Sequence, residues 1–195
     1  MTIANSRTRY GTVAMSLHWL IAALVIANIC LGLYFSDMSH NDPRLFALVQ
    51  THKSIGLTVL ALSVLRLLWR LVNPVPPLPP GMGPFLRFAA HASHFLLYFL
   101  IIAIPLSGWA LVSSSPLGLP TMYFGWFEWP HIGFLAGLTR AQKIPLSHGF
   151  GATHVILAWL AIVLVPVHVL AALYHQFIRR DGVLKRILPG TAETA

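Results

Sequence analysis

The sequence predicts an all-α integral membrane protein, a four-helix bundle with both termini in the cytoplasm. The chain has 195 residues, of which 56% are hydrophobic and only 9% are charged, whereas a soluble domain carries about 25% charged residues. It also contains four apolar stretches long enough to cross a bilayer, for which a helix needs about 20 such residues. Because this length suits one bundle, we expect a single membrane-embedded domain over residues 1–195.

The expected helices cover residues of about 14–35, 51–71, 88–113 and 151–177. The first is too long for the apolar part of a signal peptide, and no small-residue cleavage site follows it. A proline-rich segment, NPVPPLPPGMGP, separates the second helix from the third. The loop 114–150 contains the aromatic tract YFGWFEWP, which fits either a belt at headgroup level or a lid over a site.

The basic residues orient the bundle. Four spans put both termini on one side, and that side carries nine Lys and Arg residues against four on the other, which predicts cytoplasmic termini. The two sets are Arg7, Arg9, Arg66, Arg70, Arg87, Arg179, Arg180, Lys185 and Arg186, and Arg44, Lys53, Arg140 and Lys143.

The few acidic residues exclude several functions. The chain has five, and none lies inside an apolar span, which argues against a carboxylate proton relay, a cation transporter or a carboxylate-bridged metal site. The net charge of +8 fits topology and contact with membrane lipids better than nucleic acid. The single Cys30 gives no disulfide framework.

Three histidines of the last span lie on one stripe. His154, His168 and His175 are spaced by 14 and 7 residues, which returns each to nearly the same helix face. Ionisable residues inside a membrane are costly and usually functional. His154 and His168 are about 21 Å apart along the axis, so the helix offers an imidazole near each membrane face. This suits two stacked haems; the alternative is three interfacial or packing histidines.

Matching depths pair these histidines with others. His18 lies at the depth of His168 on the cytoplasmic half, and His52 at the depth of His154 on the non-cytoplasmic half. Each pair is able to supply both axial ligands of one haem. The chain has no C-x-x-C-H motif for covalent attachment, so the haem is expected to be of the b type, bound without a covalent link. His94 remains an alternative partner for His168.

Arg66 is expected near the cytoplasmic pair. It follows His52 by 14 residues on nearly the same helix face. A buried guanidinium needs an anionic partner, and a haem propionate would be suitable. The alternative is that Arg66 reaches the lipid headgroups. The remaining histidines fall in loops and are interpreted as solvated or locally hydrogen-bonded: His40, His131 and His148.

Together these features resemble the bacterial cytochrome b561 family. The resemblance rests on His18-Trp19, on His52, on the tracts RLLWRLVNPVPP and AHASHFLLY, and on two histidines 14 apart in the last span. The chain is also similar to the membrane cytochrome b subunits of formate dehydrogenases and nickel–iron hydrogenases. The resemblance implies a bundle in the bacterial inner membrane with two haems, one held by His18 and His168 and the other by His52 and His154.

Some members of that family act as superoxide oxidases, which pass electrons from superoxide to ubiquinone. Lys53, Arg140 and Lys143 are candidates for a positive periplasmic mouth that steers the anion. The candidates for a quinone or haem environment on the cytoplasmic side are Arg87, His91, His94 and His175. The alternative function is a cytochrome b subunit or carrier that relays electrons between quinone and a partner dehydrogenase. A third hypothesis, a channel or scaffold, predicts no haem.

Overall fold

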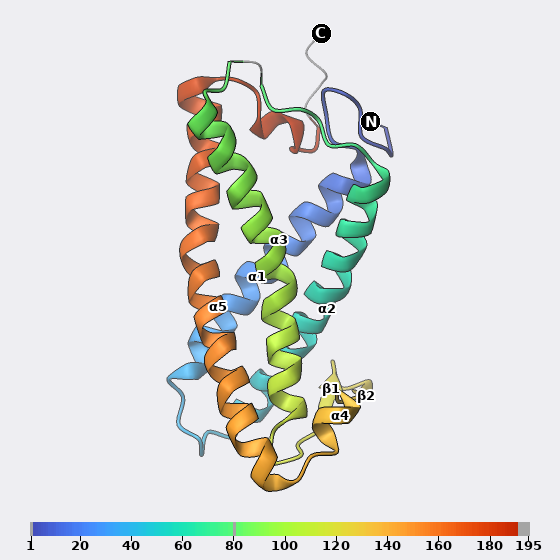
Figure 1. Cartoon of the computed structure of the whole chain (residues 1–195), viewed down its shortest axis with the longest axis vertical. Coiled ribbons are helices and arrows are strands. Elements are labelled where there is room, and N and C mark those ends of the chain that lie inside the picture. The colour runs from blue at the N-terminus through green and yellow to red at the C-terminus, as the bar shows by residue number, and fades with distance from the viewer. Residues whose placement is uncertain (1, 80, 191–195) are drawn as a thin grey trace.

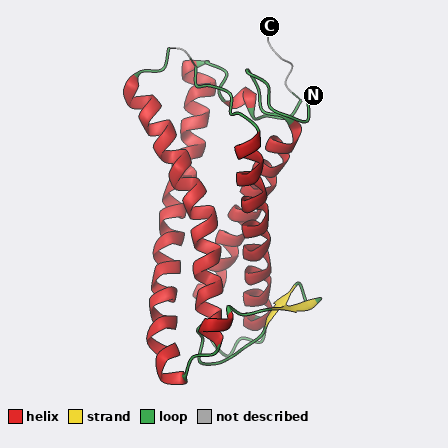
Figure 2. Ribbon diagram, turned by 45° about the vertical axis from the view of Figure 1, so that its right-hand side comes forward, coloured by secondary structure: helices red, strands yellow, loops and turns green. Residues whose placement is uncertain are grey.

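Four long helices form the body of the protein. The computed structural model describes residues 2–79 and 81–190, with α1 at Thr12–Ser36, α2 at Leu45–Val72, α3 at Pro84–Ser113 and α5 at Arg140–Tyr174. All four are long and apolar enough to cross a membrane. The packed pairs are α1 with α2, α2 with α3 and α3 with α5, and the helices run lengthwise along the molecule (Figures 1 and 2). The predicted helical protein with four spans is confirmed.

Two helices begin earlier than hydropathy suggests, since α2 starts at Leu45 and α5 at Arg140. A capping box starts α5: the side chain of Thr139 accepts a bond from the backbone N–H of Gln142, and that of Gln142 accepts one from the backbone N–H of Thr139. The apolar pattern is interrupted within residues 140–150 by Lys143, Pro145, His148 and Gly149. The helix therefore continues beyond its apolar part, which a hydropathy pattern does not detect.

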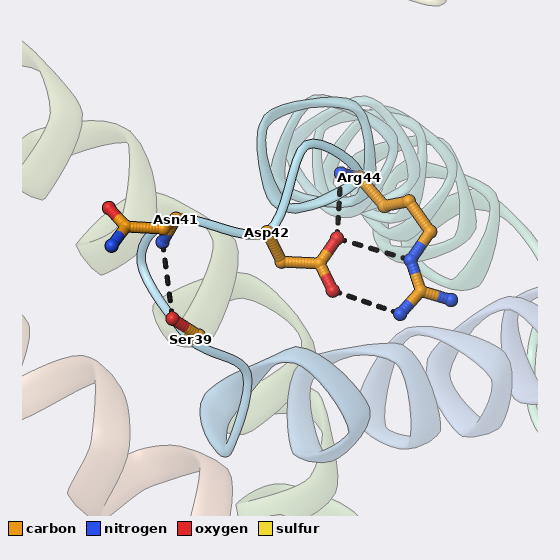
Figure 3. Close-up of polar contacts among 4 residues, drawn as sticks. All are labelled: Ser39, Asn41, Asp42 and Arg44. Carbon is orange, nitrogen blue, oxygen red and sulfur yellow. Dashed lines mark hydrogen bonds and ion pairs between the residues drawn. The ribbon is translucent and has the colours of Figure 1, made fainter.

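A local carboxylate precedes α2 in the connection from α1. Asp42 accepts bonds from the backbone N–H of Arg44 at 2.9 Å and from its guanidinium at 3.1 and 2.9 Å (Figure 3). These bonds hold the pKa of the Asp42 carboxyl below its ordinary value. A negative charge at this position favours the N-terminus of α2.

The aromatic tract forms a short β-hairpin, so the all-α prediction is wrong for this segment. Strands β1, Thr121–Tyr123, and β2, Phe127–Trp129, pair antiparallel and precede the short helix α4, Gly133–Ala136. Phe124 and Gly125 have positive φ values of 48° and 76°, as a type I′ turn requires. Strand pairing satisfies the hydrogen-bonding groups of the backbone in this tract. The pattern of aromatic residues alone did not predict this pairing.

The hairpin is attached to the bundle both at its turn and just after its second strand. The Phe124 N–H donates to Oγ of Ser54 on α2 at 2.9 Å. Nε1 of Trp109 on α3 donates to the Pro130 carbonyl at 3.0 Å. The tip residue Trp126 is 81% exposed. The backbone of the tract is thus bonded to α2 and α3, while the Trp126 side chain in the turn stays exposed.

The described residues nearest the two termini lie at the same end of the bundle (Figure 1). After α5, a π-helix, His175–Arg179, and a 3₁₀ turn, Leu184–Arg186, fold the chain back. Arg9 Nη2 donates to the Leu188 carbonyl at 2.7 Å, and Trp19 Nε1 donates to the Ile187 carbonyl at 2.9 Å. We call this the terminal end and the opposite one the hairpin end.

Candidate functional site: two histidine pairs

The hairpin-end pair consists of His52 on α2 and His154 on α5. Their ring centres are 6.1 Å apart, with an angle of 80° between the ring planes. An imidazole nitrogen binds a metal ion at about 2 Å, so two rings on opposite sides of one ion have centres roughly 6 Å apart. The separation therefore fits two axial ligands of a single iron.

The tautomer of His154 also fits a ligand. Nδ1 of His154 lies 3.0 Å from the Ile104 carbonyl and 3.1 Å from Oγ of Ser107, both on α3. The Ser107 hydroxyl donates to the same carbonyl at 2.7 Å. Because a carbonyl only accepts, Nδ1 carries the proton and Nε2 keeps its lone pair. Metal-binding histidines are commonly oriented in this way.

Two glycines make room for the rings of this pair. A Cβ atom at Gly108 on α3 would lie 3.1 Å from Cε1 of His154, and one at Gly32 on α1 would lie 3.3 Å from Cε1 of His52. Each ring is thus packed by its Nδ1–Cε1 edge against the backbone of a neighbouring helix. The sequence pattern did not assign these glycines to the site. Each lies at the same depth in the bundle as a candidate ligand, but only the contact between neighbouring helices identifies it.

The same pair opens into a cavity of about 440 Å³ at the centre of the bundle. All four long helices line it, mostly with apolar side chains, and Lys53 and Thr121 lie at its wall. Lys53 Nζ donates to the Pro120 carbonyl at 3.0 Å and to Oγ1 of Thr121 at 3.2 Å, so the hairpin segment borders the cavity. An apolar cavity with a few convergent polar groups is typical of a cofactor site.

Asn28 is a third site residue that the sequence pattern did not identify. It lies on α1 and lines the cavity, and its Oδ1 is buried without a hydrogen-bond partner among the described residues. A lone amide in the middle of the first span was the available signal, because an unpaired buried polar group is costly.

The terminal-end pair is His18 on α1 and His168 on α5. Their ring centres are 6.4 Å apart, again close to the roughly 6 Å expected for two ligands of one metal ion. His94 on α3 is the third ring of this group, 5.7 Å from His168. Both partners considered for His168 are therefore within reach.

Cationic and aromatic groups surround this second pair. Arg66 Nη1 donates to the Ala14 carbonyl at 2.7 Å, one helical turn before His18. The guanidinium of Arg66 lies 5.8 Å from the Tyr98 ring centre and that of Arg70 lies 5.3 Å from it. Arg66 thus points into the bundle, and Arg70 and Tyr98 join it, which the sequence analysis did not foresee.

Tyr10 approaches the same group from the segment before α1. Burial raises the pKa of its hydroxyl above the ordinary value, although the nearby Arg70 acts in the opposite direction. The hydroxyl therefore keeps its proton and remains a hydrogen-bond donor at neutral pH.

Other predicted residues are placed farther from the pairs. Arg87 and His91 are exposed on the first two turns of α3. Nδ1 of His175 donates to Oδ2 of Asp181 at 2.6 Å, so this side chain holds the chain reversal after α5. Arg140 and Lys143 lie in the first turn of α5, with Arg140 about 21 Å along the helix from His154.

The geometry defines a membrane-spanning helical bundle whose paired imidazoles suit haem iron. The family model described as "Prokaryotic cytochrome b561" matches residues 9–190, and the chain belongs to this family. It is therefore a multi-pass membrane protein of a family of haem-containing, transmembrane electron-transfer proteins.

Three relatives with curated names match nearly the whole chain. "Cytochrome b561 homolog 2" of Escherichia coli strain K12 is 38% identical over 188 residues, covering 96% of this chain and 95% of the relative. A Yersinia pestis protein named "Probable superoxide oxidase CybB" is 27% identical, with coverage of 93% and 96%. "Cytochrome b561 homolog 1" of the same Escherichia coli strain is 25% identical, with coverage of 93% and 97%.

Proposed function

We propose that the protein oxidises superoxide at the hairpin end and reduces ubiquinone at the terminal end, through two b-type haems. The observation that carries this proposal is the presence of two histidine pairs with ring separations of 6.1 and 6.4 Å at two levels of one bundle. Bound haem supplies one-electron chemistry at each level. The hairpin end faces the periplasm, following the distribution of basic residues.

Lys53 supports superoxide as the donor. Its ammonium lies at the wall of the cavity that contains His52 and His154, and two of its three hydrogens are directed to the hairpin segment. A fixed positive charge at such a cavity attracts a small anion. Arg140 and Lys143, at the start of α5, extend the positive field at longer range.

The terminal end has groups suited to a quinone. Arg66, Arg70 and Tyr98 lie together there, and the protonated Tyr10 hydroxyl is a donor for a quinone carbonyl. His94, with exposed His91 and Arg87 on the same helix, completes the candidate quinone environment. Two superoxide anions lose one electron each and become dioxygen, and ubiquinone takes up the two electrons and two protons to give ubiquinol.

Stopped-flow reduction of the purified, haem-loaded protein by superoxide tests the donor. We expect reduction faster than superoxide loss in buffer, and a rate that falls as salt rises. Lys53→Met should slow reduction about tenfold or more while it leaves haem content unchanged, since steering contributes at least that factor.

Arg44→Gln is the matched control, because it removes one charge at the same end but away from the cavity. If superoxide reduces the protein no faster than the uncatalysed background, the superoxide proposal is wrong. Reduction by a quinol at a normal rate in that case favours the alternative, a cytochrome b that relays electrons to a partner dehydrogenase.

A further inference from the structure

A small cavity forms where the chain leaves α5 at the terminal end. The π-helix His175–Arg179 is followed by Arg180 at φ 54° and Gly182 at φ 73°, which turn the backbone sharply. The resulting cavity has a volume of about 300 Å³ and is lined by Gln176, Phe177, Arg180, Gly182 and Lys185. It is separate from both histidine pairs.

The charge of this cavity is positive. Arg180 and Lys185 line it, and the Nε–H of Arg180 donates to the Phe177 carbonyl at 3.3 Å, which orients the guanidinium at the wall. The neighbouring carboxylate of Asp181 is held by His175 at 2.6 Å and by Arg179 at 3.5 Å. Among the described residues, none of those that line the cavity carries a carboxylate, so an anion is the ligand that the charge of the cavity favours.

Apolar side chains lie directly beside these cations. Phe177 is 67% exposed, and Ile178 is 71% exposed. About two turns before Phe177, Leu170 lies in the membrane-span part of α5 and is 64% exposed. The basic cavity lies where the apolar span ends, so a ligand with an anionic head and an apolar tail fits the cavity and the apolar helix face beside it.

We propose that this cavity binds the phosphate group of an anionic phospholipid, with its acyl chains along the exposed apolar face of α5. Arg180 and Lys185 contact the phosphate, and Phe177 packs against the start of an acyl chain. The site is independent of the redox function proposed above.

Native mass spectrometry of the full-length, haem-loaded protein in detergent tests the site, with phosphatidylglycerol, phosphatidylcholine or inorganic phosphate added. We expect one saturable phosphatidylglycerol, bound at least fivefold more tightly than phosphatidylcholine. Arg180→Asn and Lys185→Gln should each weaken it by about fivefold, the effect of one basic residue near a membrane surface. Asn tolerates the positive φ at position 180.

Arg7→Asn is the control, because it removes one positive charge at the same end but outside the cavity, and it should leave the affinity unchanged. If Arg7→Asn weakens binding as much as the two cavity variants, only diffuse surface charge attracts the lipid and the proposal is wrong. Competition by millimolar inorganic phosphate, without discrimination between the two lipids, would assign the cavity to a free anion instead. Lys185→Gln keeps the test decisive if Arg180→Asn fails to fold.

Discussion

His168 has two neighbours of its own kind, and single substitutions separate their roles. The ring of His94 is nearer to His168 than that of His18, at 5.7 against 6.4 Å. Both separations are close to the roughly 6 Å expected for two ligands of one ion, so distance does not separate the two candidates. The matching depths of His18 and His168 on their helices favour His18 as the ligand. We expect His18→Ala to remove one low-spin haem and His94→Ala to leave both, measured as haem per protein and by electron paramagnetic resonance. Loss of a haem in His94→Ala, with two retained in His18→Ala, would reverse the assignment.

Gly108 offers a second test at the scale of one residue. Gly108→Ala puts a methyl group 3.1 Å from Cε1 of His154, closer than ordinary contact, so the ring must move away from the Ile104 carbonyl. We expect the hairpin-end haem to be lost or to become high-spin, visible in the absorption spectrum. The matched control is Gly149→Ala on α5, where the added Cβ has no heavy atom within 4 Å. A normal spectrum for Gly108→Ala would show that this packing does not position His154.

At the scale of an element, the hairpin depends on α2 for its position. Ser54 is fully buried. Its Oγ accepts the Phe124 N–H, and its single hydroxyl hydrogen is shared between the carbonyls of Gln50, at 2.8 Å, and Met122, at 3.1 Å. Ser54→Ala leaves the N–H unpaired, which costs about 1–3 kcal/mol. We expect faster amide hydrogen exchange over residues 121–129, with the long helices unchanged. Thr51→Ala, whose hydroxyl bonds only the Ala47 carbonyl of its own helix, should leave the exchange rates as they are.

The helices and the hairpin differ in how far sequence predicts them. The four apolar stretches predicted the four membrane spans, because a segment that crosses the lipid must be a continuous hydrophobic helix. The starts of α2 and α5 did not follow from hydropathy, since local side-chain bonds at Asp42 and Thr139 decide them. The hairpin was not predicted, because its position depends on contacts to α2 and α3, which are distant in the sequence. At the site, spacing and depth predicted the histidine rings that meet, whereas Gly32, Gly108 and Asn28 are recognised only when neighbouring helices are seen together.

At the scale of the whole molecule, the two ends of the described chain hold each other. The Trp19 indole N–H donates to the Ile187 carbonyl, and the Trp19 ring packs edge-on against His18 at 5.1 Å. Trp19→Phe keeps the ring but removes the bond, which is worth about 1 kcal/mol. We expect a lower midpoint of thermal unfolding, with the haem bands retained. Trp126→Phe at the exposed hairpin tip should not change the midpoint; an equal drop in both variants would assign the effect to general loss of tryptophan packing.

Because His154 and His168 both belong to α5, the number of residues between them sets the distance between the two histidine pairs. Inserting or deleting a single residue between them would turn one imidazole by about 100° and point it out of the bundle. A change of seven residues would keep both rings facing inward but alter the gap by about 10 Å. Only length changes close to a whole number of helical turns therefore keep both rings directed into the bundle, and every such change alters the distance between the two histidine pairs.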